Sequence, residues 1–209
     1  ALSHIMDPGM PAGPSESIVL ADNSADPWNT ALDLMNEAEH GPDSACVFVT
    51  DSKEMADKVR DNLVKVVESL PQPRREYCEA VFSDYGGIML CKSMKDCIAF
   101  CNDYAPEHLV LKVEDIDRIL PQLQNAGEIL IGETTPSTLG NFGIGINHVL
   151  PTGGTAKTQS CTSVWDFLKR TSLSHVTTKG YHSIKAPVIA VAEYEGFPGH
   201  AKVLIERNE

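Results

Sequence analysis

The sequence lacks long hydrophobic runs, has few aromatic side chains and carries few basic residues. Aromatic residues make up 6% of the 209 positions. No apolar run approaches the roughly 18 residues that a membrane-spanning helix needs. The 17 basic residues are outnumbered by 29 acidic ones, which leaves a net charge of −12. Because nucleic acids and anionic membranes are bound through clusters of positive charge, we expect neither as a partner.

Cysteine is also scarce, with six residues and no Cys-x-x-Cys pair, which argues against a disulfide scaffold. Cys97 and Cys101 lie on one predicted helix beside apolar residues, so we interpret them as buried thiols. This usage predicts a reducing compartment, the cytoplasm. The chain starts at Ala1 without an initiator Met or a signal peptide, and we interpret it as a fragment of a longer protein.

What the sequence does contain is an alternation of short apolar segments with amphipathic ones. Strands are expected at 45–50, 87–90, 109–111 and 127–132, and helices at 27–40, 55–70, 75–81, 93–104 and 113–124. Such alternation predicts an α/β fold, a Rossmann-like parallel sheet with helices on both faces. After a Gly- and Thr-rich stretch, a short helix is expected at 164–170 and a last one near 201–206.

Three segments carry candidate chemistry. Glu37 and His40 are three residues apart at a helix end, a spacing that suits a metal, although acidic helix ends are common. Glu107 and His108 are interpreted as two acid/base groups lining a cleft at a strand end, the alternative being ordinary surface. The run 147–155 has glycines that allow a ligand close to the backbone, but it matches neither a Walker loop nor a dinucleotide turn. Its alternative is a flexible connector.

Five runs together resemble the histidinol dehydrogenase family. In the family's order they are Met10-Pro-Ala-Gly-Pro-Ser-Glu16, Ala38-Glu-His-Gly-Pro-Asp-Ser44, Ala105-Pro-Glu-His-Leu109, Asn147-His-Val-Leu-Pro-Thr-Gly153 and Asp166-Phe-Leu-Lys-Arg-Thr171. They match only the family's C-terminal half, so an N-terminal half of the same protein is an expected partner. The resemblance implies three parts: the end of a preceding domain with a substrate loop (1–18), an incomplete Rossmann-like domain (19–160) and a C-terminal helical arm (161–209).

The resemblance also implies an activity, the zinc- and NAD-dependent oxidation of L-histidinol through the aldehyde to L-histidine. His108 would be the general base, Glu107 would activate a water, and His148 would line the same cleft. Ser15 and Glu195 would contact the substrate. Most of the NAD site would lie in the N-terminal half. The family is a homodimer whose arm reaches the partner, so Glu195 and His200 would complete the other subunit's site.

The metal-binding positions depart from the family. Where it has Gln, His, Asp and His, this chain has Glu37, His40, Asn141 and His200. The two changes cancel in charge, which predicts that zinc still binds with its carboxylate moved across the ion. The move alters the substrate's surroundings. Two alternatives to a histidinol-oxidising enzyme therefore stay open: a relative that oxidises another small polar alcohol, such as a diol sulfonate, and a non-catalytic relic that acts as a binding subunit.

Overall fold

The computed structural model describes residues 9–11 and 13–208 and divides them into two units. The first ends at Leu168 and the second begins at Lys169. Of the segment 1–18 assigned to a preceding domain, residues 1–8 and 12 lie outside the described part, and the sheet already begins at Glu16. None of the helices in the described part has the length and hydrophobicity to span a lipid bilayer.

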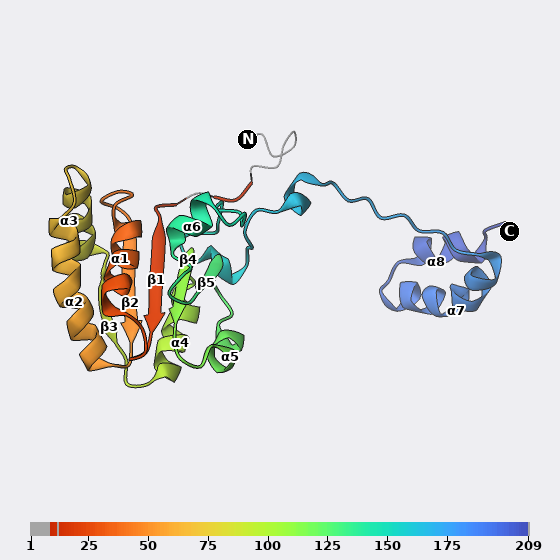
Figure 1. The fold of residues 1–209 in the computed structure, drawn as a ribbon. Helices are drawn as coiled ribbons and strands as arrows, with labels where there is room; N and C mark the ends of the chain where they lie inside the picture. Colours follow the sequence, from red (N-terminus) through yellow and green to blue (C-terminus); the bar gives the residue numbers. More distant parts are fainter. Residues whose placement is uncertain (1–8, 12, 209) are drawn as a thin grey trace. The chain divides into compact units, whose positions relative to one another are not determined.

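The first unit contains a parallel sheet of five strands in the order β3-β2-β1-β4-β5 (Figure 1). The strands are β1 Glu16–Ala21, β2 Ala45–Thr50, β3 Gly87–Leu90, β4 His108–Lys112 and β5 Glu128–Ile131. The predicted Rossmann-like α/β fold is therefore confirmed. Sequence reasoning missed the central strand β1, all of whose residues are buried, because it follows directly on the Pro- and Gly-rich run 8–14.

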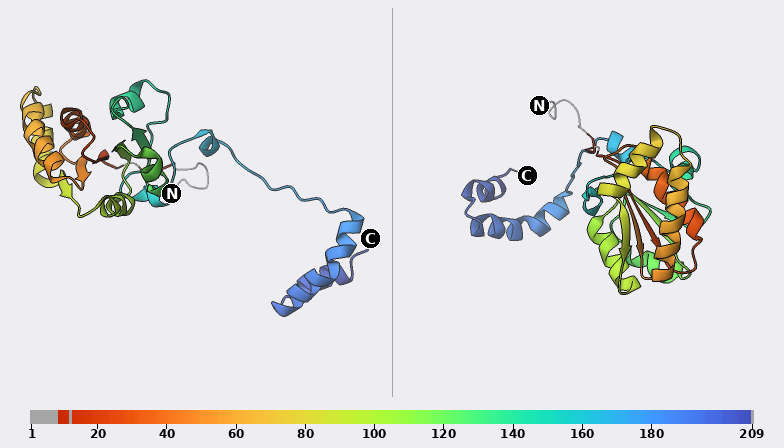
Figure 2. Two further views of the ribbon diagram at one scale, coloured as in Figure 1. Left: turned by 60° about the horizontal axis from the view of Figure 1, so that its bottom comes forward. Right: turned by 90° about the vertical axis from the view of Figure 1, so that its left-hand side faces the viewer.

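Helices cover both faces of the sheet (Figure 2). One face packs against α1 Pro27–Ala38, α2 Lys53–Glu68 and α3 Arg74–Asp84, and the other against α4 Met94–Tyr104 and α5 Ile116–Ile119. Successive strand residues point to opposite faces, so each central strand contributes to both cores. In β1, Val19 packs under α1–α3, while Ile18 and Leu20 pack against the face of α4 and α5.

Two predicted helices differ from the observed ones. The helix expected at 113–124 is reduced to α5 and the 3₁₀ turn η1 Leu120–Gln122, because Pro121 has no N–H to continue an α-helix. The one expected at 164–170 is the 3₁₀ turn η3 Val164–Phe167, held by a capping box between Ser163 and Asp166. The interpretation of the cysteines holds: all six are free, and Cys97 and Cys101 are buried.

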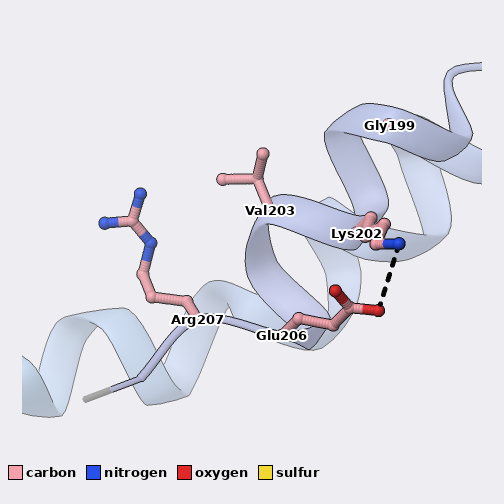
Figure 3. Close-up of a pocket in the computed structure, with 5 residues that line it drawn as sticks. All are labelled: Gly199, Lys202, Val203, Glu206 and Arg207. Atoms are coloured by element: carbon pink, nitrogen blue, oxygen red, sulfur yellow. Dashed lines mark ion pairs between the residues drawn. The ribbon is translucent and has the colours of Figure 1, made fainter.

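The second unit contains two helices, α7 Thr178–Tyr194 and α8 Pro198–Ile205, joined by a turn in which Gly196 has a φ of +77°. A hollow on α8 is crossed by an ion pair between Lys202 and Glu206, with Nζ and Oε1 3.5 Å apart (Figure 3). Both side chains are largely exposed, so this pair adds little stability. None of the predicted site residues lines the hollow.

Candidate functional site

Acidic and basic side chains meet at the edge of the sheet where the strands begin. β1 begins with Glu16, β4 with His108 and β5 with Glu128, and parallel strands bring their first residues to one edge. The register places His108 directly beside Glu128. Both share the strand face of Val110 and Leu130, which is the face that α1 covers. The topology thus brings an imidazole and a carboxylate together under the end of α1.

Helix α1, which packs on this face of the sheet, adds a second buried carboxylate. Its buried stripe includes Leu34, Glu37 and Ala38, so Glu37 in the last turn faces the sheet and is fully buried. Glu37 Oε2 lies 4.0 Å from His108 Nε2, and Glu107 Oε1 lies 3.7 Å from the same nitrogen. On the other side of the ring, His108 Nδ1 is 2.5 Å from Glu128 Oε1. The imidazole therefore has carboxylates at both nitrogens.

These contacts shift the proton affinities of the cluster. Burial by itself lowers the pKa of His108, but the hydrogen bond that Glu128 accepts from the ring and the charges of Glu37 and Glu107 outweigh it and raise this pKa. Burial raises the pKa of Glu107, with the charge of His108 acting against it. Both pKa values are therefore raised, in Glu107 by burial and in His108 by the surrounding carboxylates, and such shifts are typical of groups that handle protons. The predicted acid/base pair is thus brought together by the structure.

A loop that follows α6 (Ser137–Phe142) forms one wall of the site. Its residues Val149, Leu150 and Thr152, together with His148, line a cavity of about 200 Å³ that also contains Glu107. His148 itself is exposed. The loop is held to β1 by Glu16, whose Oε1 accepts a hydrogen bond from Gly153 N at 2.5 Å. Of the acid/base residues that the sequence singled out, Glu107 and His148 therefore border one cavity.

The residues expected to hold a metal are partly assembled in the first unit. Glu37 Oε1 accepts a hydrogen bond from Asn36 Nδ2, whereas Oε2 is buried and has no hydrogen-bond donor. His40 Nδ1 lies 3.2 Å from the Glu37 carbonyl oxygen and 3.5 Å from Oε2. Donation from Nδ1 to a carbonyl leaves Nε2 as a free ligand, the usual arrangement for a metal-bound histidine. A buried anionic oxygen beside such an imidazole fits a divalent cation.

Asn141 lies on α6, whose packing ties it to the same region. Thr138 Oγ1 donates to Asn36 Oδ1, which links α6 to α1. A Cβ added at Gly140 would come within 3.3 Å of Glu128 Oε1, so α6 passes close to the acidic cluster. Asn141 is half-buried next to Gly140. Within the described residues no three His, Cys, Asp or Glu side chains lie close enough to hold a metal, and the predicted ligand set stays a prediction.

The remaining predicted residues fall in two places. Ser15 is half-buried directly before β1, and its carbonyl oxygen accepts a hydrogen bond from Ala45 N at 2.9 Å. Glu195 and His200 belong to the second unit, where they line a cavity of about 450 Å³ between α7 and α8. That cavity is otherwise apolar, being formed by valine, alanine, leucine and phenylalanine side chains. The roles of all three residues in binding stay predictions.

The opposite edge of the sheet is its carboxyl edge, where a Rossmann fold binds its dinucleotide. Here carboxylates of the chain accept hydrogen bonds from N–H groups of the backbone. The N-terminus of α1 lies here, and the Asp26 side chain accepts hydrogen bonds from Trp28 N and Asn29 N. Glu133 accepts from Asp26 N at 2.9 Å. A pyrophosphate would need these same N–H groups. In this structure these N–H groups are bonded to the carboxylates of Asp26 and Glu133.

Sequence reasoning missed two residues of the site, Glu16 and Glu128. A signal for Glu128 was present, because it stands at the start of a predicted parallel strand while His108 directly precedes another, and such starts share one edge. Glu16 could not be found this way, since β1 was not predicted. Together the sheet order and the acid/base cluster define an α/β protein of Rossmann topology whose candidate site lies at the amino edge of the sheet.

Comparison with known proteins identifies the family. The family model "Histidinol dehydrogenase" matches residues 1–208. The chain is 49% identical to a histidinol dehydrogenase of Synechocystis, over 99% of this chain and 48% of that protein. It is 44% identical to a "histidinol dehydrogenase homolog" of Colwellia psychrerythraea, over 97% of this chain and 46% of that protein. The chain belongs to the histidinol dehydrogenase family.

A solved structure agrees in fold. The crystal structure of histidinol dehydrogenase from Elizabethkingia anophelis matches with a TM-score of 0.87 at 34% identity, covering 93% of this chain and 44% of that one. The chain thus spans about half the length of the relatives that it matches.

Proposed function

We propose that this chain is the C-terminal, catalytic part of a zinc-dependent, NAD-linked alcohol dehydrogenase that oxidises L-histidinol through its aldehyde to L-histidine. The observation that carries the proposal is the His108 imidazole held between carboxylates, with Glu107 beside it opening into a cavity. The family assignment supports it. Six free cysteines are in keeping with a cytoplasmic enzyme.

His108 serves as the base for the first oxidation. Its Nδ1 is held by Glu128, so Nε2 points to the side of Glu37 and Glu107, where the alcohol would bind. Nε2 takes the hydroxyl proton as the carbinol C–H bond breaks. The carboxylate at Nδ1 stabilises the imidazolium that results.

Glu107 serves in the second oxidation. Burial raises its pKa, and it lies at the cavity wall, so it is suited to accept a proton from a water that adds to the aldehyde carbon. When bound, zinc would orient the substrate's oxygen, and NAD would accept the hydride of each oxidation. Glu37, His40, Asn141 and His200 are the residues that would hold the zinc.

The charge of the site favours an amine over a sulfonate. Glu16, Glu37, Glu107 and Glu128 all act on His108, and all four side chains are at or near full burial. The lining of the site is therefore acidic. A substrate with an ammonium group is attracted by it, whereas an anionic diol sulfonate is repelled.

The Glu107 assignment is tested by separating the two half-reactions of the complete protein. We expect Glu107→Gln to spare oxidation of the alcohol and to slow oxidation of supplied aldehyde by roughly 100-fold, since a general base contributes about 10²–10⁴. Glu79→Gln, an exposed carboxylate on α3 that pairs with Arg75, is the matched control. Equal losses in the two half-reactions would refute the role.

The substrate and the relic alternative are tested together. Formation of NADH by the complete protein is measured with histidinol, a diol sulfonate and simple diols. We expect histidinol to give the highest kcat/KM. A signal from another alcohol without one from histidinol would assign a different substrate, and a protein that binds neither metal nor any alcohol would be a relic.

The metal set is tested by metal content. We expect Glu37→Gln and Asn141→Asp each to weaken zinc binding by changing the charge at the ion, and the double variant to restore it. His175→Gln, which belongs to none of the proposed sets, is the control. If neither single variant binds zinc more weakly than the double variant, the compensation idea is wrong.

We also propose a homodimer in which the arm supplies Glu195 and His200 to the partner's site. Two observations support it: α7 has no buried residue within its 17 positions, and Val188, Val191 and Val203 are exposed. A mixture of His108→Ala and His200→Ala subunits tests it. Arm exchange leaves one intact site in each hybrid dimer, so mixing restores activity. An inactive mixture that contains hybrid dimers would refute exchange.

A further inference from the structure

We propose that Glu16 is a positioning residue that holds the loop 147–155 against the sheet and sets the orientation of Glu107. This inference rests on the proposed function for its catalytic consequence, but not for the contacts. Glu16 is the last residue of the run Met10–Glu16, and neither the acid/base roles nor the metal set uses it. It is 8% exposed, so its carboxylate needs partners inside the protein.

The carboxylate of Glu16 finds those partners in the loop. Gly153 N donates to Oε1 at 2.5 Å, and Gly154 N and the Tyr104 hydroxyl also hydrogen-bond to the side chain. Gly153 and Gly154 have φ values of +60° and +76°, a backbone conformation that glycine adopts without strain. Successive N–H groups in such a turn form a concave anion site. The loop is therefore built to receive this carboxylate.

The backbone of Glu16 holds the other side of the site. Glu16 N donates to Glu107 Oε2 at 3.2 Å, which leaves Glu107 Oε1 to face His108. The loop is closely packed on both sides of this contact. A Cβ at Gly13 would lie 2.5 Å from Thr152 Oγ1, and one at Gly127 would lie 3.1 Å from Pro151 Cδ. One residue thus joins the proposed water-activating carboxylate to the loop that carries His148.

A change at Glu16 should reach the chemistry through Glu107. Replacing Glu16 with Gln keeps its size and the backbone N–H that binds Glu107. The amide nitrogen of Gln, however, cannot accept a bond from a glycine N–H, and the charge is lost. We expect the loop to loosen. Because Glu107 lines one cavity with loop residues 148–150 and 152, its surroundings are then less well fixed, and the step that needs Glu107 suffers most.

The test compares Glu16→Gln with Glu133→Gln in the complete protein. Glu133 also accepts a backbone N–H bond, from Asp26, but at the opposite edge of the sheet. For Glu16→Gln we expect amide hydrogen exchange in 147–158 to become at least about tenfold faster. We also expect kcat for aldehyde oxidation to fall more than kcat for alcohol oxidation, with KM little changed. Glu133→Gln should show neither effect.

Three results would overturn the inference: unchanged exchange in the loop, the same increase in Glu133→Gln, or equal losses in the two half-reactions. If Glu16→Gln fails to fold, Tyr104→Phe removes one hydrogen bond to the same carboxylate, and a smaller effect in the same direction is expected. A wild-type protein that oxidises neither alcohol nor aldehyde would refute the proposed function alone, because hydrogen exchange would still show whether Glu16 holds the loop.

Discussion

At the scale of single residues, the site depends on where carboxylates are buried. A carboxylate in a protein interior is costly unless charges or hydrogen bonds compensate it. In this chain hydrogen bonds compensate two of them: Glu128 is bonded to the imidazole of His108, and Glu16 is bonded to backbone N–H groups. Two carboxylate oxygens of the cluster, Glu37 Oε2 and Glu128 Oε2, are buried without a hydrogen bond. Under the proposed function, the zinc held by Glu37 would compensate the first of these oxygens.

The contact between Glu128 and His108 leads to a prediction for catalysis. Glu128→Gln keeps a hydrogen-bond acceptor at Nδ1 but removes the charge that stabilises the imidazolium. A charged hydrogen bond contributes about 1.5–3 kcal/mol, so we expect kcat for alcohol oxidation to fall by roughly 10- to 100-fold. Steady-state kinetics of the complete protein, with Glu79→Gln as control, measure this. An unchanged kcat would show that Glu128 does not support the base.

At the scale of elements, α1 links the two edges of the sheet. Its first turn is capped by Asp26 at the carboxyl edge, and its last turn carries Glu37 at the amino edge. Between them, Asp33 is buried and pairs with Lys112 at the end of β4, with Oδ2 and Nζ 2.5 Å apart. Lys112 also lies 3.1 Å from Glu133. The buried Asp33–Lys112 pair anchors the helix that positions the site, whereas Glu133 lies at its partly exposed margin.

Disrupting this pair should destabilise the protein. Lys112→Met leaves the Asp33 charge buried without its partner, and we expect a loss of about 3–5 kcal/mol in the free energy of unfolding. Adding Asp33→Leu removes the stranded charge and should recover much of that loss. Urea unfolding of both variants, with Lys53→Met as an exposed control, tests this. A loss below about 1 kcal/mol would mean that water reaches the pair.

At the scale of the whole molecule, several buried groups bind protons more tightly in the folded state. Burial is the main cause that raises the pKa of Glu16, Asp33 and Glu107, and the surrounding carboxylates raise that of His108. Between the unfolded and folded pKa values the folded protein therefore holds more protons than the unfolded chain. Each of these groups makes stability fall as pH rises through that window. The net charge of −12 acts in the same direction.

We therefore expect the metal-free protein to be most stable on the mildly acidic side. Calorimetry with a chelator, at constant ionic strength, should give a Tm that decreases from about pH 5.5 to about pH 8. The pKa of Asp22 is lowered by its hydrogen bonds despite burial. Its contribution to the stability of the folded protein is therefore lost only as pH falls below this interval. Glu16→Gln removes one of the groups and should flatten the slope. A Tm that rises with pH over this interval would contradict the assignment of these shifts.

The sequence allowed much of the fold to be predicted, for a local reason. Amphipathic spacing, Asp26-Pro27 at a helix start and short β-branched runs act within ten residues or so, and four of the five strands follow from them. The fifth, β1, was hidden because Ile18, Val19 and Leu20 are too short a run to be distinguished from a loop beside prolines. The resemblance to the family rested on five short sequence motifs, which can be read from the sequence without knowledge of the fold.

By itself, the sequence determined the fold class, the family and the adjacent pair Glu107–His108. Only the tertiary structure decided that His108 meets Glu128 and Glu37, that Glu16 binds Gly153, and that Glu133 accepts a hydrogen bond from Asp26 N. The reason is physical: helix and strand signals come from neighbouring residues, whereas contacts between residues 20 to 137 positions apart depend on strand order and register. Those are set by how the whole core packs, and no local pattern contains them.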